Sequence, residues 1–314
     1  MRAQGRPSWG IVATTRAPLP DILRFAAYHL DLGADRVHLL LDEPNRLAVR
    51  ILRQNPKIDI RVCSDGYWQR RKIDRPDKHQ VRQSKNADFI YRQTDVDWLA
   101  HIDVDEFLWP KTPIPDLLHD IPDDIPAVRI RPIEALAGDD DMYKAFISEG
   151  PRRAALVEAL YPNYGPFLVS GFLSHTQGKL FVRTGLPEIS DRIHTVFQYK
   201  QLLPCNTELP QIDLCHRHAP SWDHWMSHYR YRLQHGSYKP GLKRNTARAL
   251  GGLNKHELLS WIEAEQGQPG LRAFYDEMSA ANPDVRARLE KHGLILHRPL
   301  ALDQKVLKHF PGTR

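Results

Sequence analysis

Three carboxylates that follow an apolar run are the residues of this sequence best suited to chemistry. In residues 97–110 (DWLAHIDVDEFLWP), Asp103, Asp105 and Glu106 end a stretch in which apolar and polar positions alternate. An extended chain would place Asp103 and Asp105 on one side, about 7 Å apart at roughly 3.3 Å per residue. A hard cation such as Mg²⁺ or Mn²⁺, which prefers oxygen ligands, would relieve the repulsion between these anions. The alternatives are a surface turn with solvated acids or a helix that begins at Asp105.

The elements that must position these carboxylates alternate between strand and helix patterns over the first hundred residues. The expected strands are residues 9–14, 36–41, 58–63 and 97–103, and the expected helices are residues 21–32, 46–54 and 78–93. This alternation is typical of a mostly parallel sheet covered by helices, which binds ligands at the carboxyl ends of its strands. Four polar groups fall at such ends: Thr14 with Thr15 and Arg16, Asp42, Asp65, and Asp103 with Asp105.

After Pro110 the pattern becomes irregular and then helical. Shorter strands are expected at residues 127–130, 179–183 and 212–215, and helices at residues 222–234, 239–250, 256–265, 270–279 and 284–292. We therefore divide the chain into an α/β domain, residues 1–220, and a C-terminal helical region, residues 221–314. The apolar rows of that helical region need a partner, so we expect it to dock on the first domain.

Composition narrows the class of protein. The 314 residues are 41% hydrophobic, which is enough for a full-sized core, and they contain no apolar run long enough to span a membrane. The first residues lack a signal-peptide pattern, so we expect a cytoplasmic protein. Three cysteines without a CxxC pair support neither a disulfide framework nor a zinc site. The net charge of +6 suits a nucleotide or phosphate ligand better than nucleic acid, because no basic tract is present.

Several segments together resemble one family. They are TTRAPLPDILRFAAYHLDLGADRVHLLLDEPN, DKHQVRQSKNADF, DWLAHIDVDEFLWP, GKLFVRTG, RIHTVF and LCHRHAPSWDHWMSHYRYRLQHGSY. Over roughly residues 8–240 the chain resembles a bacterial branch of the family 2 glycosyltransferases. The resemblance implies the GT-A fold, a Rossmann-like, mostly parallel sheet with helices on both faces. It also implies a nucleotide-binding half at about residues 8–110 and an acceptor half at about residues 111–220.

The activity that the resemblance implies is sugar transfer from a nucleotide-sugar donor to an acceptor hydroxyl, with inversion at the anomeric carbon. Asp103 and Asp105 would hold Mn²⁺ or Mg²⁺ on the donor diphosphate, and Asp105 is central to catalysis in this interpretation. A histidine of the LCHRH segment, His216 or else His218, would be a further ligand, and a neutral imidazole suits that role. The acceptor would be a glycan, a glycolipid or another surface-polymer precursor, and peripheral contact with the inner membrane face is left open.

Other residues receive roles in donor binding. Thr14, Thr15, Arg16, Asp42 and Asp65 match family positions that contact the base and ribose. Two basic residues of the helix before the acidic motif, Arg82 and Lys85, could meet the diphosphate, and Gln83 and Asn86 could bind the donor sugar. The alternatives are loop-forming aspartates, a solvated helix face and caps of neighbouring loops.

The catalytic base must reach the acceptor hydroxyl. The candidates are Glu188, Asp191 and His194, of which we favour Asp191, although a structural hydrogen bond between Asp191 and His194 fits the spacing equally.

Two rival functions use the same features. A nucleotidyl- or phosphotransferase could use these carboxylates on a nucleoside triphosphate, although the sequence has no Walker-type phosphate loop. A basic adaptor could bind an anionic polymer or membrane through the helical region.

Overall fold

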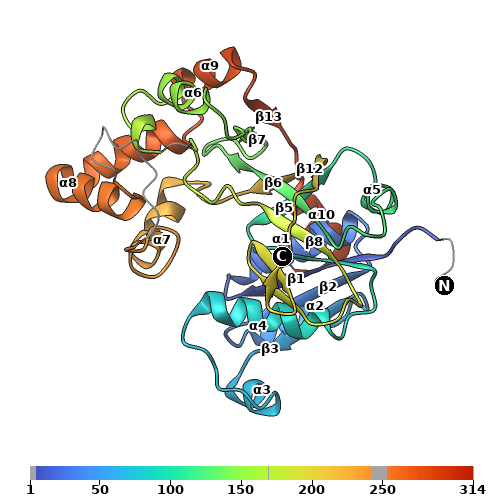
Figure 1. Ribbon diagram of the computed structural model, residues 1–314. Helices are drawn as coiled ribbons and strands as arrows, with labels where there is room; N and C mark the ends of the chain where they lie inside the picture. Colours follow the sequence, from blue (N-terminus) through green and yellow to red (C-terminus); the bar gives the residue numbers. More distant parts are fainter. Residues whose placement is uncertain (1–4, 169, 242–252, 314) are drawn as a thin grey trace. The chain divides into compact units, whose positions relative to one another are not determined.

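The strands expected in the first hundred residues form the parallel part of a sheet. In the computed structural model, which describes residues 5–168, 170–241 and 253–313, they are β1 (Trp9–Thr15), β2 (Arg36–Leu41), β3 (Ile58–Val62) and β4 (Trp98–His101). Their order is β3-β2-β1-β4 and every pair is parallel. Figure 1 labels the first three of these strands. β1 is buried along its whole length, as expected of a central parallel strand covered on both faces.

The chain divides into two compact units. Unit 1 comprises residues 1–131, 177–214 and 301–314, and unit 2 comprises residues 132–176 and 215–300. This division differs from the predicted boundary near residue 220, because residues 132–176 group with the helical region and the last residues return to unit 1. The predicted separation into catalytic and appended regions concerns function and stays a prediction.

The helices of the parallel part lie close to their predicted ranges. They are α1 (Leu19–Asp31), α2 (Arg46–Leu52), α3 (Asp65–Arg70) and α4 (His79–Tyr91), of which only α3 was not expected. Gly33 follows α1 with a φ of 96°, a conformation that favours glycine and ends the helix. With right-handed crossovers, the connections from β1 to β2 and from β2 to β3 place α1 and α2 on one face of the sheet. The connection from β3 to β4 runs in the opposite direction along the sheet and places α4 on the other face. α4 packs with Val12, Leu40 and Leu99 in one apolar cluster.

The remainder of unit 1 extends the sheet with antiparallel strands. β8 (Lys179–Arg183) pairs with β4 and with the first residues of β6 (Ala127–Ala135). The sheet is therefore mixed, parallel from β3 to β4 and antiparallel beyond β4. The other elements of unit 1 are β5 (Glu106–Pro110), α5 (Ile114–His119), β9 (Ile189–Arg192), β10 (Thr195–Gln198), β11 (Gln201–Leu202) and α10 (Leu302–His309), and β12 (Glu208–His216) contributes residues to both units.

Unit 2 is built around an aromatic core. Its elements are the end of β6, β7 (Met142–Lys144), α6 (Arg153–Leu160), the 3₁₀ helix η1 (Gly165–Phe167), α7 (Trp222–Gln234), α8 (Lys255–Ser279), α9 (Pro283–Lys291) and β13 (Ile295–His297). Trp225, Tyr229 and Leu233 of α7 are buried in one cluster with residues of α6 and α8. The predicted apolar row thus finds its partners inside unit 2.

Two expected helices are joined in the structure. The helices expected at residues 256–265 and 270–279 form the single element α8, which kinks at Gly267, where φ is 62°. Most of the helix expected at residues 239–250 lies outside the described residues. Among the described residues, no helix has both the length and the apolar character that crossing a membrane requires.

Candidate functional site

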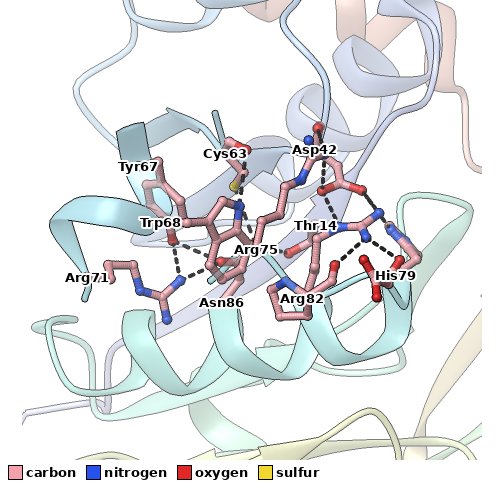
Figure 2. A network of polar contacts seen from close by, with 12 residues as sticks. Thr14, Asp42, Cys63, Tyr67, Trp68, Arg71, Arg75, His79, Arg82 and Asn86 are labelled. Carbon is pink, nitrogen blue, oxygen red and sulfur yellow. Dashed lines mark hydrogen bonds and ion pairs between the residues drawn. The ribbon is translucent and has the colours of Figure 1, made fainter. Parts of the chain in front are cut away.

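At the carboxyl ends of β1 and β2, basic side chains surround one buried carboxylate, that of Asp42. Asp42 follows β2, and its backbone N–H donates to the carbonyl of Thr15 at the end of β1 (2.8 Å). The Asp42 carboxylate accepts from Arg82 Nε (2.7 Å) and Nη2 (2.6 Å), and it contacts His79 Nδ1 at 3.0 Å (Figure 2). Arg75 donates to the Asp42 carbonyl at 2.9 Å. Asp42, placed at this strand end by the sequence, is thus held in a fixed orientation.

The electrostatics of Asp42 follow from these partners. Burial by itself would raise its pKa, but the hydrogen bonds and charges of His79 and Arg82 hold the pKa well below its usual range. The Asp42 side chain is only 1% exposed and is therefore a buried anion. Arg82, for which contact with a diphosphate was predicted, points to Asp42 in this structure.

A second group of contacts joins the end of β1 to α3. Asn86 is fully buried and donates to Thr14 Oγ1 (3.2 Å), while its Oδ1 accepts from Tyr67 Oη (2.9 Å) and Arg71 Nη1 (2.8 Å) (Figure 2). Asn86 also donates to the sulfur of Cys63 (3.4 Å), and burial raises the pKa of this thiol to about 12. Cys63 is therefore a buried free thiol that packs beside Asn86.

The acidic motif does not continue β4 as an extended chain. β4 ends at His101, and the Glu106 N–H donates to the Asp103 carbonyl at 3.0 Å, which closes a turn before β5. The Glu106 carboxylate accepts from the Asp103 N–H at 2.7 Å. The extended geometry expected for Asp103 and Asp105 is therefore wrong, because this turn redirects the chain. A helix beginning at Asp105 is wrong as well, since a strand follows.

A buried lysine that sequence reasoning missed lies against this turn. Lys179, the first residue of β8, is fully buried, and its Nζ lies 2.6 Å from Asp103 Oδ2 and 3.3 Å from Glu106 Oε2. Burial would lower the pKa of Lys179, but the two carboxylates raise it above its ordinary value. Gln83 donates to the other oxygen of Asp103 at 2.6 Å. The Lys179 ammonium therefore partly neutralises two of the three acids, Asp103 and Glu106, and Asp103 remains 29% exposed.

Side chains of one helix, α4, form hydrogen bonds at the ends of three strands. Arg82, Gln83 and Asn86 of α4 reach the polar residues at the ends of β2, β4 and β1 respectively. The first strand has β2 on one side and β4 on the other, so the strand order reverses at this place, where open α/β sheets bind their ligands. The sequence named Gln83 and Asn86 as a pair, and both point to this edge.

The other residues predicted to bind the donor are found near the carboxyl ends of these strands or on α4. Thr15 accepts from the Ala17 N–H at 2.9 Å, and Arg16 is exposed just after β1. Asp65 is exposed at the first position of α3, where it suits the positive end of the helix. Lys85 is exposed, and its carbonyl accepts from Arg71. The structure does not bring Asp65 or Lys85 into the contacts of Asp42.

The candidate base, Asp191, is buried within β9. Its Oδ1 lies 3.5 Å from Nδ1 of the buried His101, and its backbone N–H donates to Asp88. His194 contacts the Gly178 carbonyl at 2.8 Å instead of forming the hydrogen bond with Asp191 that the spacing allowed. The role of Asp191 as a base stays a prediction.

Unit 2 contains a cluster of three histidines. The ring centroids of His175 and His216 are 5.0 Å apart, and those of His216 and His218 are 5.3 Å apart. His218 contacts Tyr238 Oη at 2.8 Å through Nε2. Burial, and then the nearby charge of Arg232, lowers the pKa of His218 far below its ordinary value, so this ring stays neutral. Nothing in the sequence around His175 indicated that it joins the two predicted histidines.

The donor types present suit a divalent cation. The residues with suitable ligand atoms are Asp105 and Glu106 in unit 1 and His175, His216 and His218 in unit 2. Carboxylate oxygen and neutral imidazole nitrogen are ligands that Mn²⁺ accepts, and carboxylate oxygen suits Mg²⁺. They do not identify the metal.

Comparisons with known proteins give only a distant likeness of fold. No protein-family model matches the chain, and no curated protein matches it. Among solved structures, the apo bifunctional glycosyltransferase WbbM is similar at 13% identity with a TM-score of 0.30, over 58% of this chain and 32% of that protein. A Bacillus anthracis protein in complex with sucrose, provisionally assigned as a glucose-1-phosphate thymidylyltransferase, is similar at 9% identity with a TM-score of 0.29, over 46% and 61%.

A third such structure is HddC from Yersinia pseudotuberculosis, at 12% identity with a TM-score of 0.26, over 57% of this chain and 74% of that one. The chain spans about a third of the first of these proteins and about three fifths of the second. At these identities and TM-scores we draw neither a fold family nor a function from the three likenesses.

Proposed function

We propose that this protein is a metal-dependent glycosyltransferase that moves a sugar from a nucleotide-sugar donor to an acceptor hydroxyl, with inversion. The observation that carries the proposal is the convergence of α4 on the ends of β1, β2 and β4, where polar side chains surround the reversal of strand order. A nucleotide with a diphosphate needs hydrogen-bond partners for its base and ribose beside a place for a cation. In this proposal the ends of β1 and β2 supply the hydrogen-bond partners for the base and ribose, and the acidic turn supplies the place for the cation.

Each residue has a role in this proposal. Arg82 and His79 hold the Asp42 carboxylate, whose side chain is only 1% exposed, so a hydroxyl or N–H of the nucleoside would reach it by displacing one of its partners, His79 or Arg75. Thr14 and Thr15 contact the same part of the donor. Arg16 and Asp65 contribute to it from the loops after β1 and β3, and Lys85 stays a candidate for the diphosphate.

The cation would be Mn²⁺ or Mg²⁺ held by Asp103 and Asp105, with His216 as a further ligand. When bound, it stabilises as a Lewis acid the charge that develops on the departing diphosphate. Lys179 and Gln83 hold the two oxygens of the Asp103 carboxylate in place. We propose Asp191 as the base, acting on a glycan or glycolipid acceptor.

Thermal unfolding with a panel of nucleoside diphosphates, with and without Mn²⁺, tests the class of function. At a ligand concentration about a hundred times Kd, specific binding stabilises a protein by roughly 2.7 kcal/mol. We expect one nucleotide to stabilise the chain only with metal present. Asp105→Asn should remove this shift and lower sugar transfer by about a thousandfold or more, whereas the exposed Asp124→Asn should change neither.

Two other results would favour one of the rival functions. Release of pyrophosphate from a nucleoside triphosphate and a sugar phosphate would identify a nucleotidyltransferase. The absence of metal-dependent stabilisation by every nucleotide would favour the adaptor. Calorimetry with the nucleotide bound measures the Mn²⁺ affinity of His216→Ala and His218→Ala and shows which histidine is a metal ligand. We expect at least about a tenfold loss of affinity for His216→Ala only.

A further inference from the structure

A basic cavity lies at the edge of the sheet in unit 1. It has a volume of about 690 Å³ and is lined by β3, by α3 with the loop after it, and by one face of α4. β3 is last in the strand order and is thus an edge strand. Six cationic side chains line the cavity, which we call the β3 groove: Arg53, Arg61, Arg70, Arg71, Lys85 and Arg92.

The β3 groove shares Lys85 with the candidate donor site, but its lining does not include the residues around Asp42 and Asp103. Lys85, Phe89 and Arg92 line it at helical spacing along α4, so they share one face of that helix. Arg82 and Gln83, which reach Asp42 and Asp103, do not line the groove. The two faces of α4 therefore border two different sites.

Most of the positive charge in the β3 groove is not balanced by nearby acids. In the part of the chain that the structure describes, Arg61 pairs with Asp59, but no ion pair joins any of the other five cations to a carboxylate. The only acidic residue of the lining is Asp88, which accepts from the Ser190 hydroxyl and from a backbone N–H of β9. A cavity of this kind attracts anions.

One arginine of the β3 groove is already fixed in place. The Arg71 guanidinium lies 4.3 Å from the centroid of the Phe89 ring and donates to Tyr67 Oη, Asn86 Oδ1 and the Lys85 carbonyl. All of these partners are uncharged, so Arg71 keeps its full positive charge while its conformational freedom is already lost. Arg53, Arg70 and Arg92 are exposed and can approach a ligand from the rim.

We propose that the β3 groove binds a soluble small molecule that carries a diphosphate or two phosphate groups. Planar guanidinium groups bind phosphate oxygens in pairs and form short, charge-assisted hydrogen bonds. A volume of about 690 Å³ falls within the usual range for small-molecule sites. This binding needs no metal and does not depend on the proposed glycosyltransferase activity.

The test uses the whole chain and inorganic pyrophosphate in excess EDTA, with binding measured by calorimetry. We expect one pyrophosphate per chain, and citrate should bind at least about tenfold more weakly. Arg53→Gln with Arg92→Gln should weaken pyrophosphate binding by roughly tenfold or more, because two charge-assisted contacts are lost. The matched control, Arg46→Gln with Arg50→Gln, removes two exposed arginines of α2 that lie outside the lining and should change Kd by less than about twofold.

Several results would overturn the proposal. They are absence of pyrophosphate binding in EDTA, equal affinity for citrate, or equal losses in the two double variants. Stronger binding to vesicles of anionic phospholipid than to soluble pyrophosphate, lost in the Arg53/Arg92 variant, would also overturn it by assigning the groove to a lipid headgroup. Both double variants should unfold at the temperature of the unmodified chain, since all four side chains are exposed.

Discussion

Two fully buried lysines, one in each unit, have different surroundings. In unit 1, Lys179 contacts Asp103 and Glu106, and Asp103 remains 29% exposed at a strand end. In unit 2, Lys144 contacts Glu134 at 2.9 Å, and neither side chain is more than 2% exposed. Both lysines have charged partners, but only the first group reaches the surface, where a ligand can meet it.

The hydrogen bonds of the two groups explain this difference. Lys144 also donates to the carbonyls of Gly171 (3.0 Å) and Met278 (2.6 Å), and Glu134 accepts from two backbone N–H groups. The ammonium therefore has all three of its protons on protein acceptors. A closed set of this kind fixes chain segments in place, whereas a carboxylate that keeps an exposed side can also bind substrate or metal.

Lys144→Met should give the largest loss of stability. It leaves Glu134 buried without its cation, and breaking a buried pair in this way costs about 3–5 kcal/mol. Urea unfolding monitored by circular dichroism measures the loss. A loss below about 1 kcal/mol would show that Lys144 does not organise the core of unit 2.

Lys179→Met should destabilise the protein less and impair function more. Asp103 can regain water on its exposed side, and the fully buried Glu106, which lies farther from the lysine at 3.3 Å, keeps its hydrogen bond from the Asp103 N–H, so we expect a loss of about 1–3 kcal/mol, the usual cost of unsatisfied polar groups. Metal-dependent binding of nucleotide should weaken because Asp103 loses the cation that orients it. Equal stability losses for both lysine variants, with nucleotide binding intact in Lys179→Met, would remove the distinction between the two groups.

The pH dependence of the unfolding free energy tests the contribution of the buried Lys144–Glu134 pair of unit 2. Burial would raise the pKa of Glu134, but Lys144 and the hydrogen bonds from Ser174 lower it from 4.5 to about 2. A depressed carboxyl pKa contributes stability that is complete above the unfolded value and is lost as the pH falls toward the folded value. Between pH 4.5 and about pH 2 the unmodified chain should therefore lose stability.

The variant in which Glu134→Gln is combined with Lys144→Met isolates this contribution. It removes both charges together, so it should be more stable at neutral pH than Lys144→Met alone. Its unfolding free energy should also fall less between pH 4.5 and about pH 2, as measured by urea titrations at several pH values. An unchanged slope would assign the acid sensitivity to other carboxylates.

The parts of the fold that could be predicted from the sequence are those with local signals. The strands and helices up to residue 101, apart from α3, follow from apolar periodicity, and Asp42 could be placed because it directly follows a strand. A turn at these acids was only an alternative to the extended chain, because the hydrogen bond from the Asp103 N–H to the Glu106 side chain, which overrides the alternating pattern, has no local sequence signal.

The contributions of Lys179 and His175 depend on tertiary contacts. Lys179 begins an ordinary strand, and only the antiparallel pairing of β8 with β4 brings it beside an acid 76 residues earlier. His175 approaches His216 through the fold of unit 2 and not through sequence spacing. The sequence identifies which residue types can act at a strand end, but the tertiary partners decide how each is oriented and charged.

The smallest effect is expected for a third lysine, Lys308, whose partner is the carboxylate of Asp31. This pair joins α10 to the end of α1 at 2.6 Å, but the Lys308 side chain is 68% exposed and Lys305 also approaches the same carboxylate. Water screens such a pair, so Lys308→Ala should cost about 0–1 kcal/mol in urea unfolding, and less at high salt. The three lysine variants would then rank by how completely the lysine and its nearest carboxylate are buried together, with Lys144 first and Lys308 last. If Lys308→Ala cost as much as Lys144→Met, the docking of α10 rather than the burial of charge would control the stability of the chain.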